Sequence, residues 1–124
     1  IAIAATTGMI RDLTAKPDAM LAALQQGFPT ATDLADYMVR ELGMPFREAH
    51  HASGAIVAAA AKKDVDIEEL SLAELQAIEP RIKPDIIGQL SVAKAVAART
   101  SFGGTAPDEV RARIADAKQR FGLT

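Results

Sequence analysis

The chain contains no cysteine and no tryptophan, and aromatic side chains make up only 4% of its 124 residues. Without cysteine there is no disulfide scaffold and no thiol chemistry, which fits a reducing compartment, so we expect a cytoplasmic protein. No apolar run reaches the roughly 20 residues of a membrane span, and no signal-peptide pattern opens the chain, so we expect no membrane partner. The net charge of −2 argues against a general affinity for nucleic acid.

Apolar residues are plentiful, at 49% of the chain, but many of them are alanine. Alanine favours helix strongly and fills little volume, so a core built from it needs closely packed helices or a partner. No window alternates apolar and polar residues, and no Asn-Gly or Asp-Gly pair marks a hairpin. We therefore predict an all-α fold, either one small domain of helix-turn-helix pairs or a piece of a larger protein.

Residues 28–51 predict two helices joined by a tight turn, and the rest of the chain can be arranged around them. Thr30 suits the cap of the first helix, with its hydroxyl accepting a hydrogen bond from a backbone N–H. Gly43 can end that helix in the left-handed conformation, and Pro45 suits the first turn of the next. The expected buried faces are Ala31, Leu34, Ala35, Met38 and Leu42, then Phe46, Ala49, Ser53, Ile56 or Val57, and Ala60.

The amino-terminal segment, residues 1–14, has the pattern of a helix end already under way, so we expect the chain to begin at a proteolytic or cloning boundary. Gly8 is tolerable there if another helix passes close by. Residues 17–27 predict a short helix that Gly27 closes. Its expected buried side is Met20, Leu21 and Leu24.

The second half of the chain predicts five helical segments after the central pair, of which the first four are short. The second helix of that pair should reach Lys63, with Gly54 marking a close crossing. Asp66 can cap a single turn, and Ser71 with Glu74 forms a capping box for a helix that Pro80 ends. The other expected elements are a turn at 83–88, a helix capped by Ser91 with Val92 and Val96 buried, and a last helix capped by Thr105 and closed by Gly122.

The last helix carries Val110, Ile114, Ala117 and Phe121 along one side. On its exposed side we expect two acid-first pairs four residues apart, Glu109–Arg113 and Asp116–Arg120.

Few side chains invite a chemical interpretation. His50, His51 and Glu48 give at most two ligands on one side of a helix, too few for zinc, so we expect His50 to border the core and His51 to face solvent or a neighbour. Tyr37 could orient a ligand, but packing at a helix interface is the simpler interpretation. Two candidates remain. Gly103, Gly104 and Thr105 could bind an anion or form an ordinary capped turn. Arg99, with Thr100 and Ser101, could bind a substrate carboxylate or cap the preceding helix.

Three runs carry a resemblance to a known family: ATDLADYMVR at 31–40, GMPFREAHH at 43–51 and ARTSFGGTAP at 98–107. They resemble the C-terminal domain of argininosuccinate lyase, and the likeness extends along the whole chain. It implies that residues 1–14 are the end of a helix of the family's central bundle and that residues 15–124 are the C-terminal domain. The turn at 41–44 looks one residue longer than in many relatives, which should not disturb the fold.

The resemblance also implies a function for the parent enzyme. That family cleaves argininosuccinate to arginine and fumarate by β-elimination in arginine biosynthesis, without a cofactor, as a homotetramer whose active sites combine several subunits. Its glycine- and serine-rich loop, the Met-Pro-x-Lys-x-Asn-Pro run and the catalytic histidine region have no counterpart in these residues. We therefore assign no catalytic, cofactor-binding or metal residue here, and expect an inactive piece with a structural, cleft-closing role.

Three alternatives remain open at this stage. The first is another lyase of the same superfamily, such as adenylosuccinate lyase or aspartate ammonia-lyase. The second is a helix-turn-helix module that binds DNA, in which the second helix would offer Arg47, His50 and His51. The third is a helical protein-interaction domain with no enzyme attached.

Overall fold

The computed structural model describes residues 1–24 and 27–123, and within these two ranges all regular structure is helical. The predicted all-α fold is therefore confirmed. The α-helices are α1 (Ala2–Arg11), α2 (Pro17–Leu24), α3 (Ala31–Leu42), α4 (Phe46–Lys63), α5 (Leu72–Ile78), α6 (Val92–Ala97) and α7 (Pro107–Phe121), with 3₁₀ turns η1 (Ile67–Glu69) and η2 (Pro84–Ile86).

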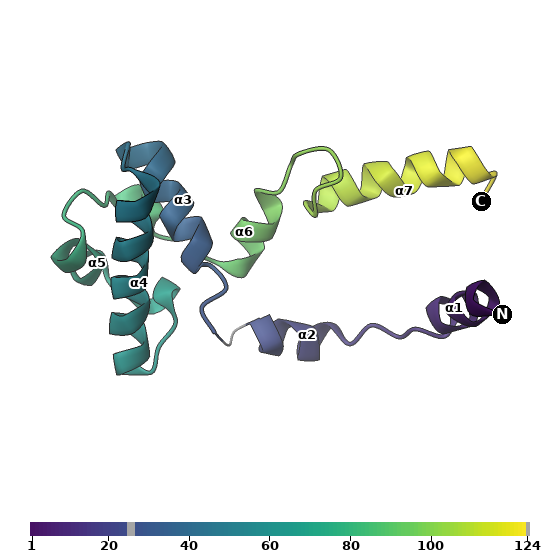
Figure 1. The fold of residues 1–124 in the computed structure, drawn as a ribbon, viewed down its shortest axis with the longest axis horizontal. Helices are drawn as coiled ribbons and strands as arrows, with labels where there is room; N and C mark the ends of the chain where they lie inside the picture. Colours follow the sequence, from purple (N-terminus) through teal and green to yellow (C-terminus); the bar gives the residue numbers. More distant parts are fainter. Residues whose placement is uncertain (25–26, 124) are drawn as a thin grey trace.

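The helices form a compact body with two projecting arms (Figure 1). The body comprises α3, α4, α5 and the two 3₁₀ turns. The N-arm, residues 1–24, carries α1 and α2, and the C-arm, residues 99–123, carries α7. Both arms leave the same side of the body, so α1 and the end of α7 lie at the same end of the molecule (Figure 1).

The centre of the body is the α3–α4 pair, as the sequence predicts. Gly43 ends α3 with φ 64°, and the next N–H, that of Met44, donates to the carbonyl oxygen of Met38 at 3.2 Å. The two helices are also joined by Ser53, whose hydroxyl donates to the carbonyl oxygen of Ala31 at 2.7 Å. The buried core comprises Leu34, Tyr37, Met38, Met44, Ala49, Ile56, Ala60, Ile67, Leu70, Leu75, Ile82, Ile86 and Leu90.

Thr30 precedes α3 as expected, but the prediction that its hydroxyl caps the helix is wrong. The Ala31 N–H donates to the carbonyl oxygen of Phe28 at 3.1 Å, which closes a turn with Pro29 and Thr30 at its centre. Thr30 has φ −86° and ψ 0°, the conformation of the third residue of a type I turn, for which Pro29 suits the second position. A side-chain cap needs an extended residue, so the turn takes the place of the cap.

Three other predicted caps are confirmed. Asp66 and Glu69 form a capping box around η1, and Ser71 and Glu74 form one at the start of α5. The Ser91 hydroxyl accepts from the Lys94 N–H at the start of α6. These caps belong to short elements that could not persist without satisfied ends, because each spans at most two turns.

Several predicted buried faces are not covered. On α2 the side chains of Met20, Leu21 and Leu24 are exposed, and on α6 Val96 is exposed and Val92 is only half-buried. Phe46, one residue after the cap position that Pro45 occupies, is 60% exposed. Helical spacing identifies an apolar face but does not supply the surface that covers it.

The two helical glycines are not close-contact positions. A Cβ placed on Gly8 or Gly54 meets no atom within 4 Å, so neither marks a helix crossing in the part of the chain that the structure describes.

The start of α7 and its ion pairs also differ from expectation. Ala106, not Thr105, is the cap residue, with Pro107 in the first turn. The ion pairs join Asp108 to Arg111 and Arg113 to Asp116, three residues apart rather than four. The guanidinium of Arg113 also lies 4.6 Å from the ring centre of Phe102 in the preceding loop.

Candidate functional site

Tyr37 belongs to the core and not to a ligand site. Its side chain is 4% exposed, and its hydroxyl donates to Oδ1 of Asp85 at 2.7 Å, which links α3 to η2. Burial, and then the hydrogen bond to Asp85, raise the pKa of Tyr37 to about 12. A phenol held in this way stays protonated and already has its partner, so packing between elements is the interpretation that the structure supports.

Arg99 contacts an acid on α3 and also helps to end α6. Its Nη2 donates to Oδ1 of Asp33 at 2.7 Å, and its backbone N–H donates to the carbonyl oxygen of Val96 at 3.1 Å. The predicted cap of the preceding helix is therefore made by the main chain of Arg99, while its side chain binds a carboxylate. A carboxylate is a stronger partner for a guanidinium than a helix-end carbonyl, because both groups carry charge. Within the described residues, the carboxylate that Arg99 binds is therefore one supplied by the protein.

The loop between Arg99 and Pro107 uses its own N–H groups. The Gly104 N–H donates to the carbonyl oxygen of Ser101 at 2.7 Å, and the Ala106 N–H donates to that of Arg99 at 3.1 Å. A Cβ on Gly104 would lie 2.1 Å from the carbonyl oxygen of Arg99, so only glycine fits. The segment is a close-packed turn, and two of the donors that an anion would need are occupied.

His50 and His51 both lie on the exposed face of α4. Their ring centres are 6.4 Å apart with the planes at 85°, and His50 lies 6.0 Å from the ring of Phe46, four residues earlier. The prediction that His50 borders the core is therefore wrong, because Phe46 turns outward and the two share one face. No group of three potential metal ligands occurs in residues 1–24 and 27–123. Nor is any helix in those ranges long and apolar enough to cross a bilayer.

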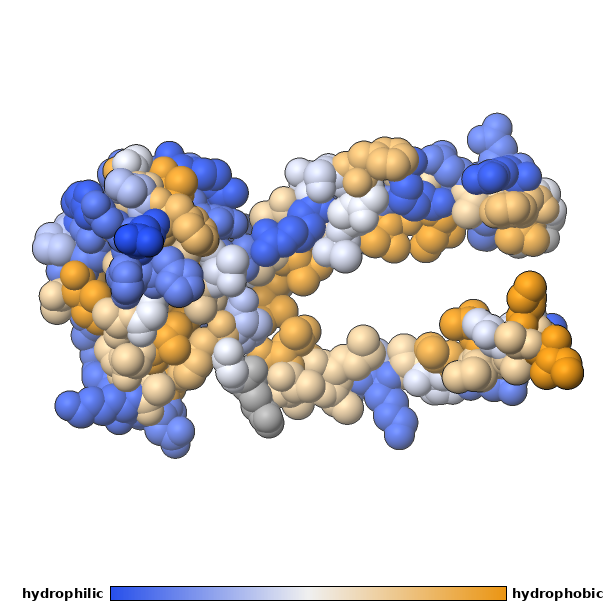
Figure 2. Space-filling model, viewed as in Figure 1, coloured by the Kyte–Doolittle hydropathy of each residue, from blue (hydrophilic) through white to orange (hydrophobic). Residues whose placement is uncertain are grey.

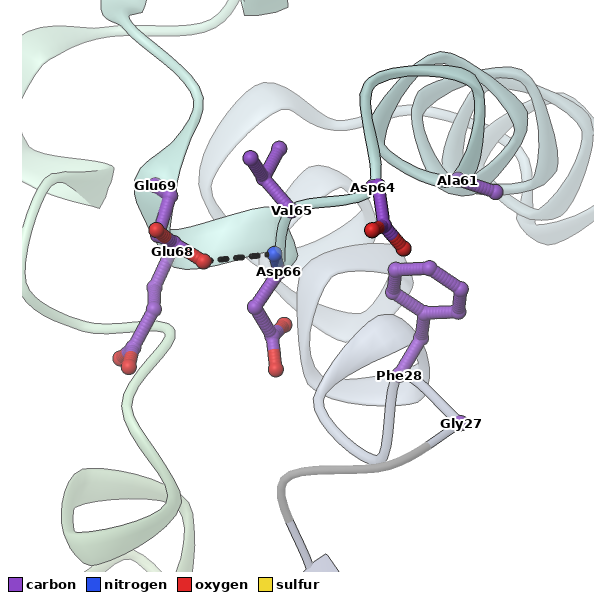
Figure 3. Close-up of a pocket in the computed structure, with 8 residues that line it drawn as sticks. All are labelled: Gly27, Phe28, Ala61, Asp64, Val65, Asp66, Glu68 and Glu69. Carbon is purple, nitrogen blue, oxygen red and sulfur yellow. Dashed lines mark hydrogen bonds between the residues drawn. The ribbon is translucent and has the colours of Figure 1, made fainter.

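An acidic pocket of about 630 Å³ lies between the residues that precede α3 and the end of α4 (Figure 3). The carboxylates of Asp66 and Glu69 are occupied in the capping box of η1. The Phe28 ring and the Asp64 carboxylate lie next to each other in the pocket. The lining contains neither a nucleophile next to a base nor a basic side chain, so it offers no arrangement for catalysis. It is lined by Gly27, Phe28, Ala61, Asp64, Val65, Asp66, Glu68 and Glu69.

The most extensive candidate surface lies on the two arms. In α1, Ile3 is 84% exposed, and it lines a shallow groove of about 440 Å³ together with Ile10. In α7, Val110, Ile114 and Phe121 follow one another at helical spacing and are all exposed. Figure 2 shows apolar surface along both arms. Exposed apolar faces of this extent are typical of interaction surfaces, so we define these two helix faces as the arm surface.

Two of the partners described above have no sequence signal. Asp33 and Asp85 meet Arg99 and Tyr37 across 66 and 48 residues, and no local pattern connects residues so far apart. Asp33 lies in the first turn of α3, and Asp85 lies within the turn predicted at 83–88. The apolar faces that form the arm surface, by contrast, could be found from helical periodicity. Periodicity does not show that these faces stay exposed.

Comparison with known families adds one finding. The family model described as argininosuccinate lyase C-terminal matches residues 28–97. The match covers more than half of the chain. It begins in the turn before α3 and ends with α6, so it contains the body, while the N-arm and α7 lie outside it.

Proposed function

The chain belongs to the argininosuccinate lyase C-terminal domain family, and from this premise we propose that it is the C-terminal domain of an enzyme that cleaves argininosuccinate to arginine and fumarate. The match over the whole body is the observation that carries the proposal. The parent would act by β-elimination in arginine biosynthesis, without a cofactor, as a cytoplasmic homotetramer.

We propose that this domain contributes no reacting group. A β-elimination needs a base beside the carbon that loses its proton and an acid beside the leaving nitrogen. Within the described residues, His50 and His51 are exposed without an orienting partner, and Tyr37 holds its proton up to about pH 12. These environments suit neither role, which favours placing the chemistry in the rest of the parent enzyme.

The proposed role of the domain is to support the active-site cleft and to close it. The arm surface supports this role, because its apolar residues would be covered if α1 continued into a central bundle and α7 packed beside it. The body would then lie at the mouth of the cleft, attached through both arms. Movement of such a body can limit turnover without any change in the chemical step.

The experiment compares the 124-residue chain with its full-length parent. Each is incubated with argininosuccinate, and fumarate release is followed by ultraviolet absorbance. We expect turnover by the parent and none by the chain. Adenylosuccinate and aspartate serve as alternative substrates, and a parent that used either of them while leaving argininosuccinate intact would contradict the proposal.

A second measurement tests the closing role. If movement of this domain limits turnover, raising the solvent viscosity should lower kcat of the parent with argininosuccinate. A kcat that does not depend on viscosity would indicate that domain movement does not limit turnover, and it would contradict the proposed closing role.

A further inference from the structure

Two residues just before α3, Gly27 and Phe28, have an unusual backbone. Gly27 has φ 86° and Phe28 has φ 57°, both in the left-handed region. Glycine adopts this conformation readily, but for a bulky side chain such as phenylalanine it is a genuine outlier. Something outside the backbone must therefore hold Phe28 in place.

The side chain of Phe28 supplies that hold. It is half-buried and packs against the hydrophobic core of the body. Figure 3 shows its ring directed into the acidic pocket beside Asp64, at the end of α4. No residue of α1 or α2 is buried, so the N-arm itself contributes little to fixing this conformation.

Thr30, two residues further along, lacks the hydrogen bond that a cap residue usually makes. Thr30 is 3% exposed, and its hydroxyl oxygen is buried with no hydrogen-bond partner. A threonine at a helix cap normally accepts from an N–H of the first turn, and leaving a buried hydroxyl unpaired is unfavourable. The cap is unmade because the turn that begins at Phe28 holds Thr30 at ψ 0°.

We propose that Phe28 and Thr30 form a two-state hinge between the N-arm and the body. In the latched state, which the structure shows, Phe28 is docked with a left-handed backbone and Thr30 is uncapped. In the capped state, Phe28 leaves the core and returns to negative φ. Thr30 then becomes extended, its hydroxyl accepts from the Asp33 N–H, and the N-arm takes a new direction. The carbonyl oxygen of Phe28 accepts from the Ala31 N–H and so closes the turn that holds Thr30 at ψ 0°, which couples the conformation of Phe28 to that of Thr30.

The hinge is independent of the proposed lyase function and concerns only this chain. A double-mutant cycle in the 124-residue chain tests it by urea unfolding. In the wild type, Thr30→Ala should leave the folding equilibrium constant unchanged or raise it, because no cap bond is lost and an unpaired buried hydroxyl is removed. In a Phe28→Ala background, Thr30→Ala should lower it about fivefold, the usual effect of removing a threonine cap.

Ser71→Ala is the matched control, because Ser71 makes a working cap on α5, well away from the hinge in sequence. It should lower the folding constant about fivefold in both backgrounds. Equal effects of Thr30→Ala with and without Phe28 would overturn the hinge, whatever their size.

A distance measurement tests the hinge without relying on stability. The chain has no cysteine, so spin labels at Ala22→Cys on α2 and Ala58→Cys on α4 report only the chosen pair. Both positions are exposed. We expect one narrow distance distribution in the wild type and a shifted or second distribution after Phe28→Ala. Identical distributions would overturn the proposal.

Discussion

The hydroxyl of Tyr37 on α3 donates a 2.7 Å hydrogen bond to the carboxylate of Asp85 on η2, and this bond ties the second half of the body to the central helix pair. The donor is buried while the acceptor residue is exposed. Removing the hydroxyl therefore leaves Asp85 free to bind water, and the expected loss is small. Tyr37→Phe should lower the free energy of unfolding by about 1 kcal/mol, measured by urea titration. Asp85→Asn, which keeps an acceptor, should cost less, and a larger loss than for Tyr37→Phe would contradict this account.

The same residue gives the chain a sensitivity to alkaline pH. The pKa of Tyr37 is raised to about 12 in the folded state, above its usual value of 10.0. The stabilisation that follows from this pKa difference is complete below pH 10, where Tyr37 is protonated in both the folded and the unfolded chain. This stabilisation is lost as the pH rises toward 12, because in that range Tyr37 releases its proton only in the unfolded chain. The loss is on the order of 2 kcal/mol.

Tyr37→Phe is the control for this alkaline effect, because it removes the titrating group. The decline between pH 10 and 12 should be smaller in that variant, as followed by urea midpoints. Since Tyr37 is the only tyrosine, its ionisation can also be read directly from ultraviolet absorbance. An absorbance midpoint near pH 10 in the folded chain would contradict the prediction.

Glu79 gives the opposite sensitivity, to acid. Its carboxylate accepts from Nε and Nη2 of Arg81 at 2.7 and 3.1 Å, and these hydrogen bonds hold its pKa below the usual range. The stabilisation is present above the unfolded pKa and is lost as the pH falls through the folded pKa. Glu79→Gln should flatten the stability profile in this acid range, measured as urea midpoints. An unchanged profile would show that Arg81 does not act on Glu79 in solution.

Gly104 and Gly54 offer a matched pair of alanine substitutions. At Gly104 the new methyl group would meet the carbonyl oxygen of Arg99, so we expect the loop to open and the ion pair with Asp33 to break. At Gly54 the methyl group meets nothing, and helix propensity should stabilise the chain by about 0.5 to 1 kcal/mol. Thermal unfolding followed by circular dichroism measures whether Gly104→Ala lowers and Gly54→Ala raises the stability of the chain. A stabilising Gly104→Ala would contradict the close approach.

The arm surface and the core should respond differently to substitution. Ile114 is 52% exposed, so Ile114→Asp should change the stability of the isolated chain by less than about 1 kcal/mol. Leu34→Ala, at a fully buried position, should cost about 2 to 5 kcal/mol. In the full-length parent, Ile114→Asp should weaken assembly or activity if α7 packs against the rest of the enzyme. Size-exclusion chromatography and the fumarate assay measure this, and an unaffected parent would exclude α7 from that contact.

Local chemistry was the part of the fold that the sequence could predict. The cap at Asp66, the capping box at Ser71 and the left-handed end at Gly43 depend on neighbours within a few residues, and all three are confirmed. Thr30 had the right residue type for a cap, but the turn through Pro29 fixed its backbone elsewhere. The predicted cap at Thr30 therefore does not form, because the turn preference of Pro29 outweighs the capping preference of Thr30.

The rest depended on partners that periodicity cannot identify. Phe46 and Val96 lie on apolar faces by spacing, yet they are exposed, because what would cover them is not among the described residues. The ion pair of Arg99 and the buried bond of Tyr37 depend on acids far along the chain, which only the folded arrangement brings near. For the candidate site, the sequence indicates which side chains are polar. It does not indicate which of them already form a hydrogen bond or an ion pair with another residue of the chain.

The buried face of α4 is built mostly from short side chains, with Ile56 as the one long side chain among its buried residues. Ala49 and Ala60 have no exposed surface, and Ser53 between them binds the Ala31 carbonyl oxygen. Helices in contact through methyl groups lie too close to admit a longer substituent without moving apart. Volume therefore restricts which amino acids this side of α4 can accept, whereas its outer side, with Phe46, His50 and His51, is open to change. Variation among descendants of this chain should accordingly accumulate on one side of that helix.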